Sequence, residues 1–142
     1  MRLSTKCSIA LHCLVFISEY ENKVKVTSEL LAKSTGCNSA AIRSILNALQ
    51  KAGIISIVRG VGGAHLTCSP EELTLWEVYH ALEPEGLKHF IGFHPNPSEK
   101  CPVGRRISAV LEKPYSEIGA AVQKCMEGIT LQQLLDDYRA GF

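Results

Sequence analysis

The sequence lacks the features that mark membrane and secreted proteins. None of its apolar runs approaches the ~20 residues that a membrane-spanning helix needs. The first residues carry no signal-peptide pattern, because the apolar segment after them is interrupted by His12 and has the spacing of a helix face. We therefore expect a cytoplasmic protein that has no membrane partner.

The six cysteines and five histidines form no recognisable reactive or metal-binding set. Because no Cys-x-x-Cys pair occurs, the cysteine spacing does not predict a zinc site. No nucleophile, base and orienting residue occur in a pattern typical of covalent catalysis. We expect a protein that is not an enzyme and binds no metal. A weak metal site made of His89, His94 and Cys101 is the alternative.

Excess charge is also lacking overall, but the charge is unevenly distributed. The formal net charge is +1 over 142 residues. Up to Thr67 the chain has eight basic and three acidic residues, a net +5, and the remainder has seven basic and eleven acidic residues, a net −4. A basic half suits a polyanionic partner, and chance variation of solvated surface charge is the alternative.

What is present is a helix followed by a glycine-rich hairpin. The pattern predicts a helix from Asn38 to Ala52, an apolar strand over 54–58, and a returning strand over 66–68. Between the strands lies a basic turn, residues 59–65, whose glycines permit positive φ and close approach of the backbone to phosphate. This arrangement is typical of a winged helix, which binds DNA through the helix and the hairpin tip.

A second, shorter helix precedes this unit. Thr27 is placed to cap a helix over 28–34, and Gly36 can supply the left-handed residue that ends it. Asn38 then caps the following helix. Two helices joined by a glycine-containing turn predict a helix-turn-helix.

The predicted second helix has two distinct faces. Its apolar stripe, which should face the core, is Ile42, Ile45, Leu46 and Leu49. The opposite face carries Ser39, Arg43, Asn47 and Gln50, whose side chains suit the edges of bases. An ordinary solvated helix face is the alternative. For His65, at the end of the turn, a DNA contact and a plain surface position are both open.

A capping box at Thr74 and Glu77 predicts a helix that runs to about Leu82. Trp76 on this helix is expected to be a core anchor rather than a ligand platform. Proline and glycine interrupt any regular pattern between Glu85 and Lys100, so that segment is expected to be a loop.

A long helix is expected from Pro102 to Glu127, spanning about 39 Å at 1.5 Å per residue. Because this exceeds what a small core needs, we expect a homodimer, although two separate helices packed within one chain are the alternative. Pro114 should kink or break the helix. Thr130 opens a final short helix. The residues expected at the dimer interface are Val103, Ile107, Val110, Leu111, Ile118 and Val122.

Three segments of this chain, taken together in order, resemble one family. They are 1–6 leading into a buried helix, 59–63, and Leu73-Thr74-Leu75-Trp76-Glu77-Val78. The chain closely resembles the Rrf-type family of bacterial transcription regulators over almost its whole length. The resemblance implies a homodimeric winged helix-turn-helix protein that binds promoters. The DNA-contacting positions it implies are Ser4, Thr5, Lys6, Ser39, Arg43, Arg59, Gly60, Val61, Gly62 and Gly63.

The chain departs from this family in the loop before the long helix. Members that bind an iron–sulfur cluster carry three cysteines there, whereas the loop from Phe90 onward offers only Cys101. We therefore expect no cofactor and a place in the cluster-free branch. Cys101, at the expected start of the long helix, is a candidate thiol sensor, and an inert thiol is the alternative.

The sequence therefore predicts a mainly α protein with a small β-hairpin in three parts. These are a winged helix-turn-helix domain (1–83), an effector-type loop (84–101), and a dimerisation helix with a C-terminal helix (102–142). The expected function is a homodimeric repressor that reads a palindromic site in double-stranded DNA, with a small-molecule or protein effector. A winged-helix module that binds a metabolic enzyme or another partner protein is the alternative.

Overall fold

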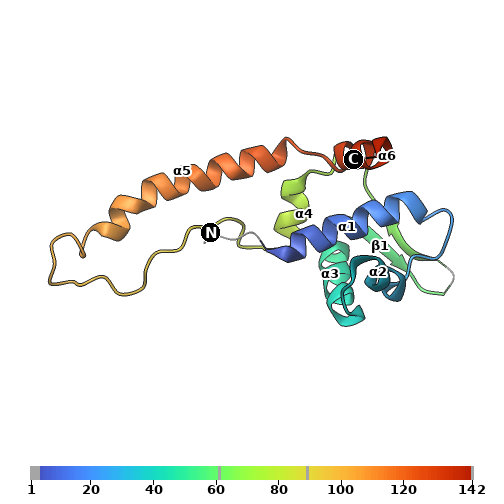
Figure 1. Ribbon diagram of the computed structural model, residues 1–142, viewed down its shortest axis with the longest axis horizontal. Helices are drawn as coiled ribbons and strands as arrows, with labels where there is room; N and C mark the ends of the chain where they lie inside the picture. The colour runs from blue at the N-terminus through green and yellow to red at the C-terminus, as the bar shows by residue number, and fades with distance from the viewer. Residues whose placement is uncertain (1–3, 61, 89, 142) are drawn as a thin grey trace.

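The computed structural model describes residues 4–60, 62–88 and 90–141 of the chain. Figure 1 shows a helical body from which one long helix and its preceding loop extend as an arm. The elements, in order, are α1 (Thr5–Tyr20), α2 (Ser28–Thr35), α3 (Ser39–Lys51), β1 (Ile55–Val58), β2 (Gly63–Leu66), α4 (Leu75–Leu82), α5 (Ile107–Glu127) and α6 (Leu131–Ala140).

The starts of the short helices follow from their capping residues, as predicted. The Thr27 hydroxyl accepts a hydrogen bond from the Leu30 amide at 3.1 Å, and the Asn38 side chain accepts one from the Ala41 amide at 2.8 Å. Gly36 ends α2 with a φ of +73°. These contacts place α2 and α3 as the two helices of a helix-turn-helix.

The hairpin differs from the prediction in the bounds of its returning strand. β1 and β2 are antiparallel, and Val58 pairs with Gly63 while Ile55 pairs with Leu66. The returning strand therefore starts at Gly63, before the predicted range of 66–68, because pairing continues as far as the glycine tip allows. Before α2, the Val26 carbonyl accepts a hydrogen bond from the Ala64 amide of β2 at 3.0 Å, although residues 24–26 form no strand of their own.

A single main core lies where α1, α3, the hairpin and α6 meet. The predicted apolar stripe of α3 is buried there, against the inner face of α1. Leu131 and Leu135 of α6 belong to the same core, each only 1% exposed. The C-terminal helix thus packs on the body that carries the helix-turn-helix.

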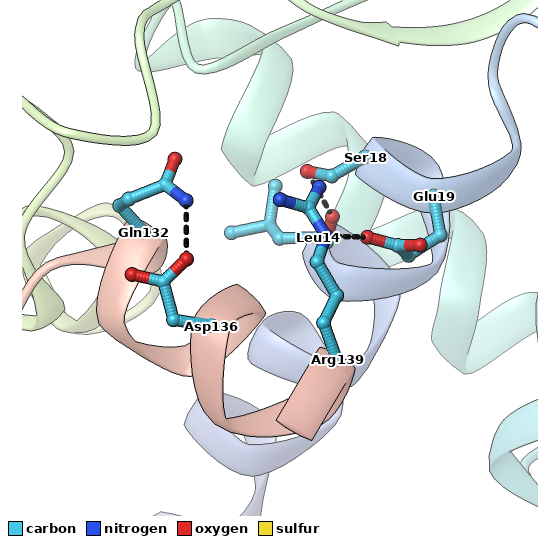
Figure 2. A network of polar contacts seen from close by, with 6 residues as sticks. All are labelled: Leu14, Ser18, Glu19, Gln132, Asp136 and Arg139. Carbon is cyan, nitrogen blue, oxygen red and sulfur yellow. Dashed lines mark hydrogen bonds and ion pairs between the residues drawn. The ribbon is translucent and has the colours of Figure 1, made fainter. Parts of the chain in front are cut away.

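Polar contacts also join α6 to α1. Figure 2 shows the Arg139 guanidinium reaching from α6 to the Glu19 carboxylate on α1, and their Nε and Oε1 atoms are 2.8 Å apart. The segment before α6 pairs with the segment before α4, where the Leu131 amide donates to the Leu73 carbonyl at 2.8 Å. Capping boxes start both helices, at Thr74 and at Thr130, as predicted.

The long helix begins later than predicted and is not broken. α5 starts at Ile107 rather than Pro102, because the preceding residues form turns in which Gly104 lies close against Ser98. It continues through Pro114, which lacks the N–H that the Val110 carbonyl would accept. At 21 residues it spans about 32 Å. The alternative of two separate helices is therefore wrong.

In Figure 1, the end of α5 nearest Ile107 lies far from the body, together with the segment before it. Among the described residues, none of the helices has both the length and the hydropathy that crossing a membrane requires.

Candidate nucleic-acid interface

The outer face of α3 presents a continuous polar surface. Arg43 and Asn47 are both exposed there, as the helical pattern predicts, and Gln50 follows toward the end of the helix. Ala40 and Ser44 are also exposed and lie beside them at helical spacing, although the sequence pattern did not single them out. Ser39, in the first turn, is half-buried.

A groove of about 330 Å³ brings this face together with the hairpin. Arg43 and Asn47 line it from α3, and Arg59, Gly60 and Gly63 line it from the hairpin. The start of α2 and the segment before it form the remaining wall. The two parts of the predicted site, which are separated in the sequence, therefore share one surface. The further lining residues are Lys25, Val26, Thr27, Ser28, Glu29, Leu46, Ile57, Val58 and Ala64.

The groove is positively charged. Lys25, Arg43 and Arg59 contribute three cationic side chains, and Glu29 is the one acidic side chain in the lining. Within the described ranges, neither arginine forms an ion pair or a hydrogen bond through its side chain. Both guanidinium groups are therefore available to a polyanion, and each can bind phosphate or a guanine edge with two parallel hydrogen bonds.

The tip of the hairpin requires its glycines for different reasons. Gly60 and Gly63 have φ values of +83° and +73°, which other residues adopt only with strain. A Cβ on Gly63 would also lie 2.8 Å from the backbone nitrogen and oxygen of Val26, and one on Gly62 would overlap the Val58 side chain. The tip is therefore a tightly built turn that brings backbone close to the groove. Val61 lies outside the described residues.

His65 has a structural contact within the hairpin. Its Nε2 donates a hydrogen bond to the Gly62 carbonyl at 2.7 Å, which stabilises the turn. The His65 side chain does not line the groove. The Leu66 amide next to it donates to the Glu21 carboxylate at 2.8 Å. These two bonds hold β2 to the turn and to the end of α1.

The predicted phosphate contacts at the start of the chain lie elsewhere. Thr5 and Lys6 are exposed in the first turn of α1, and the Ser4 hydroxyl accepts a bond from the Lys6 amide at 3.2 Å as the cap of this helix. Figure 1 shows this end of α1 on the opposite side of the body from the hairpin. Ser4, Thr5 and Lys6 thus do not line the groove.

The thiols differ sharply in environment. Burial, and secondarily the nearby Cys37, raises the pKa of Cys13 to about 12, which keeps that thiol protonated at neutral pH. Cys101 is exposed, but it lies in a turn before Ile107, so the expected position at a helix N-terminus is wrong. Of the residues in the alternative metal site, His89 lies outside the described residues. Elsewhere in the described chain, no three potential metal ligands gather.

The residues expected at a dimer interface divide into two groups. Val103, Val110 and Ile118 are 67%, 62% and 42% exposed, which is high for side chains that water solvates poorly. Ile107, Leu111 and Val122 are half-buried. Val122 already packs within the chain, against a small cluster of Cys7, Tyr79 and Met126.

The helix-turn-helix, its antiparallel hairpin and the basic groove between them define a winged helix-turn-helix protein. The family model described as Rrf2, iron-dependent transcriptional regulator, matches residues 3–137. The chain therefore belongs to the Rrf2 family of transcriptional regulators, which are not enzymes.

Three further similarities are consistent with this assignment, one in sequence and two in fold. The chain is 30% identical over 134 residues to YwnA of Bacillus subtilis (strain 168), provisionally named an HTH-type transcriptional regulator, covering 94% of this chain and 97% of YwnA. The structure of CymR of B. subtilis, the global cysteine regulator, shares the fold with a TM-score of 0.67 at 18% identity, covering 96% of this chain and 97% of CymR. The structure of T. potens IscR has a TM-score of 0.72 at 18% identity, covering 100% and 92%.

Proposed function

We propose that this chain is a homodimeric repressor that reads a palindromic promoter site and binds no iron–sulfur cluster. The observation that carries the proposal is the shared groove, in which Arg43 and Asn47 of α3 face the same space as Arg59 and Gly60 of the hairpin. In this arrangement α3 enters the major groove of duplex DNA while the hairpin tip reaches the sugar–phosphate backbone.

Each side chain then has a distinct role. Arg43 binds a guanine edge and Asn47 an adenine edge, because these are the pairings that their hydrogen-bonding groups favour. Arg59 and Lys25 neutralise phosphates and fix the register. Ser39 borders the base-reading face of α3, and Ser4, Thr5 and Lys6 are available only to DNA that extends beyond the groove.

The arm supports the homodimer. Val110 and Ile118 on α5 are apolar and exposed. In an isologous interface they pack against the same face of a second copy, which removes them from water. A two-fold axis then presents two grooves to half-sites about 34 Å apart, one turn of DNA.

The proposed absence of an iron–sulfur cluster rests on the number of cysteines available as ligands. Cys101 is the one cysteine in the segment between α4 and α5, and a cluster needs about four ligands. Protein purified without oxygen should therefore contain neither stoichiometric iron nor acid-labile sulfide. Stoichiometric amounts of both would overturn this part of the proposal.

Two arginine substitutions test the DNA-binding role. On a site selected from random DNA by the wild-type protein, Arg43→Ala should weaken binding by about 1–3 kcal/mol and relax the preference at one base pair. Arg59→Ala should weaken binding to all sequences alike and lower the salt dependence by about one phosphate contact.

Arg105→Ala is the matched control, because Arg105 is an exposed arginine in the turns before α5 and lies outside the groove. Its DNA affinity should equal that of the wild type. The proposal fails if all three variants bind the selected site equally well in an anisotropy titration.

A further inference from the structure

A second cavity lies on the arm side of the molecule, away from the basic groove. It measures about 670 Å³ and is lined by α4, by the segment that follows α4, and by one face of α5. This volume falls within the ~300–1000 Å³ of typical small-molecule sites. The residues that line it from α5 are Glu112, Tyr115, Ser116, Gly119, Ala120 and Gln123.

The walls of this cavity are held by specific contacts. The Tyr79 hydroxyl donates to the Gly86 carbonyl at 3.3 Å, and Gly86 lies so close to the Trp76 ring that an added Cβ would be 3.1 Å from its edge. Phe93 packs against Tyr115 of α5 with ring centroids 5.2 Å apart. The segment after α4 is thus anchored at one end to α4 and further along to α5, which keeps the cavity open between them.

The lining combines aromatic rings with a carboxylate on α5. Trp76, Phe93 and Tyr115 reach the cavity from three different parts of the chain. Glu112 brings a carboxylate to the cavity one helical turn from Tyr115, and the described lining also includes Glu85, Lys88 and His80. Aromatic faces attract cations through their quadrupole, and a nearby carboxylate adds to that attraction.

We propose that this cavity binds an organic cation with aromatic substituents. The rings of Trp76, Phe93 and Tyr115 contact the apolar part of the ligand, and the carboxylate of Glu112 balances its charge. The ammonium group of Lys88 in the lining disfavours a second positive charge on the ligand, so a monocation fits best.

The cavity does not compete with the proposed dimer interface. At about 100° per residue, the six cavity residues of α5 fall on one side of the helix. Val110 and Ile118, the exposed apolar residues of α5, fall on a roughly opposite side. A second copy can therefore cover the apolar side while the cavity stays accessible.

Trp76 provides a direct readout, because it is the only tryptophan in the chain. Titration with tetraphenylphosphonium should change its fluorescence in a saturable way. Tetraphenylborate has nearly the same size and shape with the opposite charge, and it should bind at least ~10-fold more weakly. The whole-chain net charge of only +1 gives either ion little non-specific attraction.

Glu112→Gln removes the charge that the proposal depends on and should raise the Kd for tetraphenylphosphonium roughly 3- to 10-fold. Glu117→Gln is the matched control, since Glu117 is exposed on the same helix but does not line the cavity. It should bind as the wild type does. Circular dichroism of both variants shows whether α5 is intact.

Equal binding of the two tetraphenyl ions, no saturable change with either, or equal Kd values for the two glutamine variants would overturn the proposal. These titrations contain no DNA, so their outcome is independent of the proposed function. A chain that binds its promoter but does not discriminate between the two ions would refute the ligand site alone.

Discussion

Single residues decide the shape of the hairpin tip. Gly63 combines a φ of +73° with a position where an added Cβ would meet the Val26 backbone, whose carbonyl accepts a bond from Ala64. A side chain here both strains the backbone and pushes the hairpin away from the segment before α2. The positions of Arg59 and Arg43 relative to each other depend on that contact.

Gly63→Ala is therefore expected to lower the free energy of unfolding by about 1–3 kcal/mol. Gly92→Ala is the matched control, because Gly92 does not have a left-handed φ and an added Cβ there would contact nothing within 4 Å. Urea denaturation of the two variants measures the difference. If Gly63→Ala were as stable as Gly92→Ala, the hairpin tip would not be a tightly packed turn.

At the scale of single residues, the sequence was most informative where the chemistry is local. Thr27, Asn38 and Thr74 could be assigned as caps because the partner amide of each lies within three residues. His65 could not be assigned, because its partner is a carbonyl in a turn whose conformation depends on three glycines. Ala40 and Ser44 were missed because they are small and carry no charge.

At the scale of elements, α6 is held to the body by burial more than by charge. Leu135 is 1% exposed in the main core, whereas Arg139, which pairs with Glu19, has a side chain that is 53% exposed. Removing an apolar side chain from a packed core loses the free energy of its burial and also leaves a cavity. The attraction within an exposed ion pair contributes little to stability, because water solvates both charges when they are apart.

We accordingly expect Leu135→Ala to destabilise the protein by about 2–5 kcal/mol. Arg139→Ala should cost less than about 1 kcal/mol. Equilibrium unfolding in urea compares the two directly. A larger loss for Arg139→Ala than for Leu135→Ala would show that the ion pair in Figure 2, rather than the leucine, holds α6 in place.

Element boundaries were harder to predict where tertiary contacts decide them. Pro102 suits the first turn of a helix, yet the turns between Ser98 and Arg106 delay α5 to Ile107. Pro114 was expected to kink or break the helix; it does not break it, and α5 continues through Pro114 at the loss of one hydrogen bond. The start of β2 at Gly63 was missed because glycine carries no strand pattern of its own.

At the scale of the whole molecule, the arm is the part of the chain that leaves aliphatic side chains exposed away from the core. Its three exposed aliphatic residues lie on or before α5, away from the core. The expected length of this helix led to the prediction of a partner, but the convergence of Arg43 with Arg59 could be expected only from the fold type. Their shared groove results from packing between α3 and the hairpin, which no local pattern specifies.

Val110→Asp places a charge in the middle of the proposed dimer interface and should shift the protein toward monomer, because an unpaired buried charge is costly. Ser108→Asp is the matched control and should leave the dimer intact. Ser108 is exposed on the same helix, but at about 100° per residue it lies on a roughly opposite side from Val110. Sedimentation equilibrium measures both variants. A wild-type protein that sediments as a monomer would contradict the proposed homodimer.

The dependence of DNA affinity on salt tests the central claim most directly. In each groove Lys25 and Arg59 are the two cations assigned to phosphates, so a dimer neutralises about four phosphates. The logarithm of the association constant for the selected site should then fall against the logarithm of salt concentration with a slope of about −4. A slope near zero would contradict a basic winged-helix groove that binds duplex DNA twice.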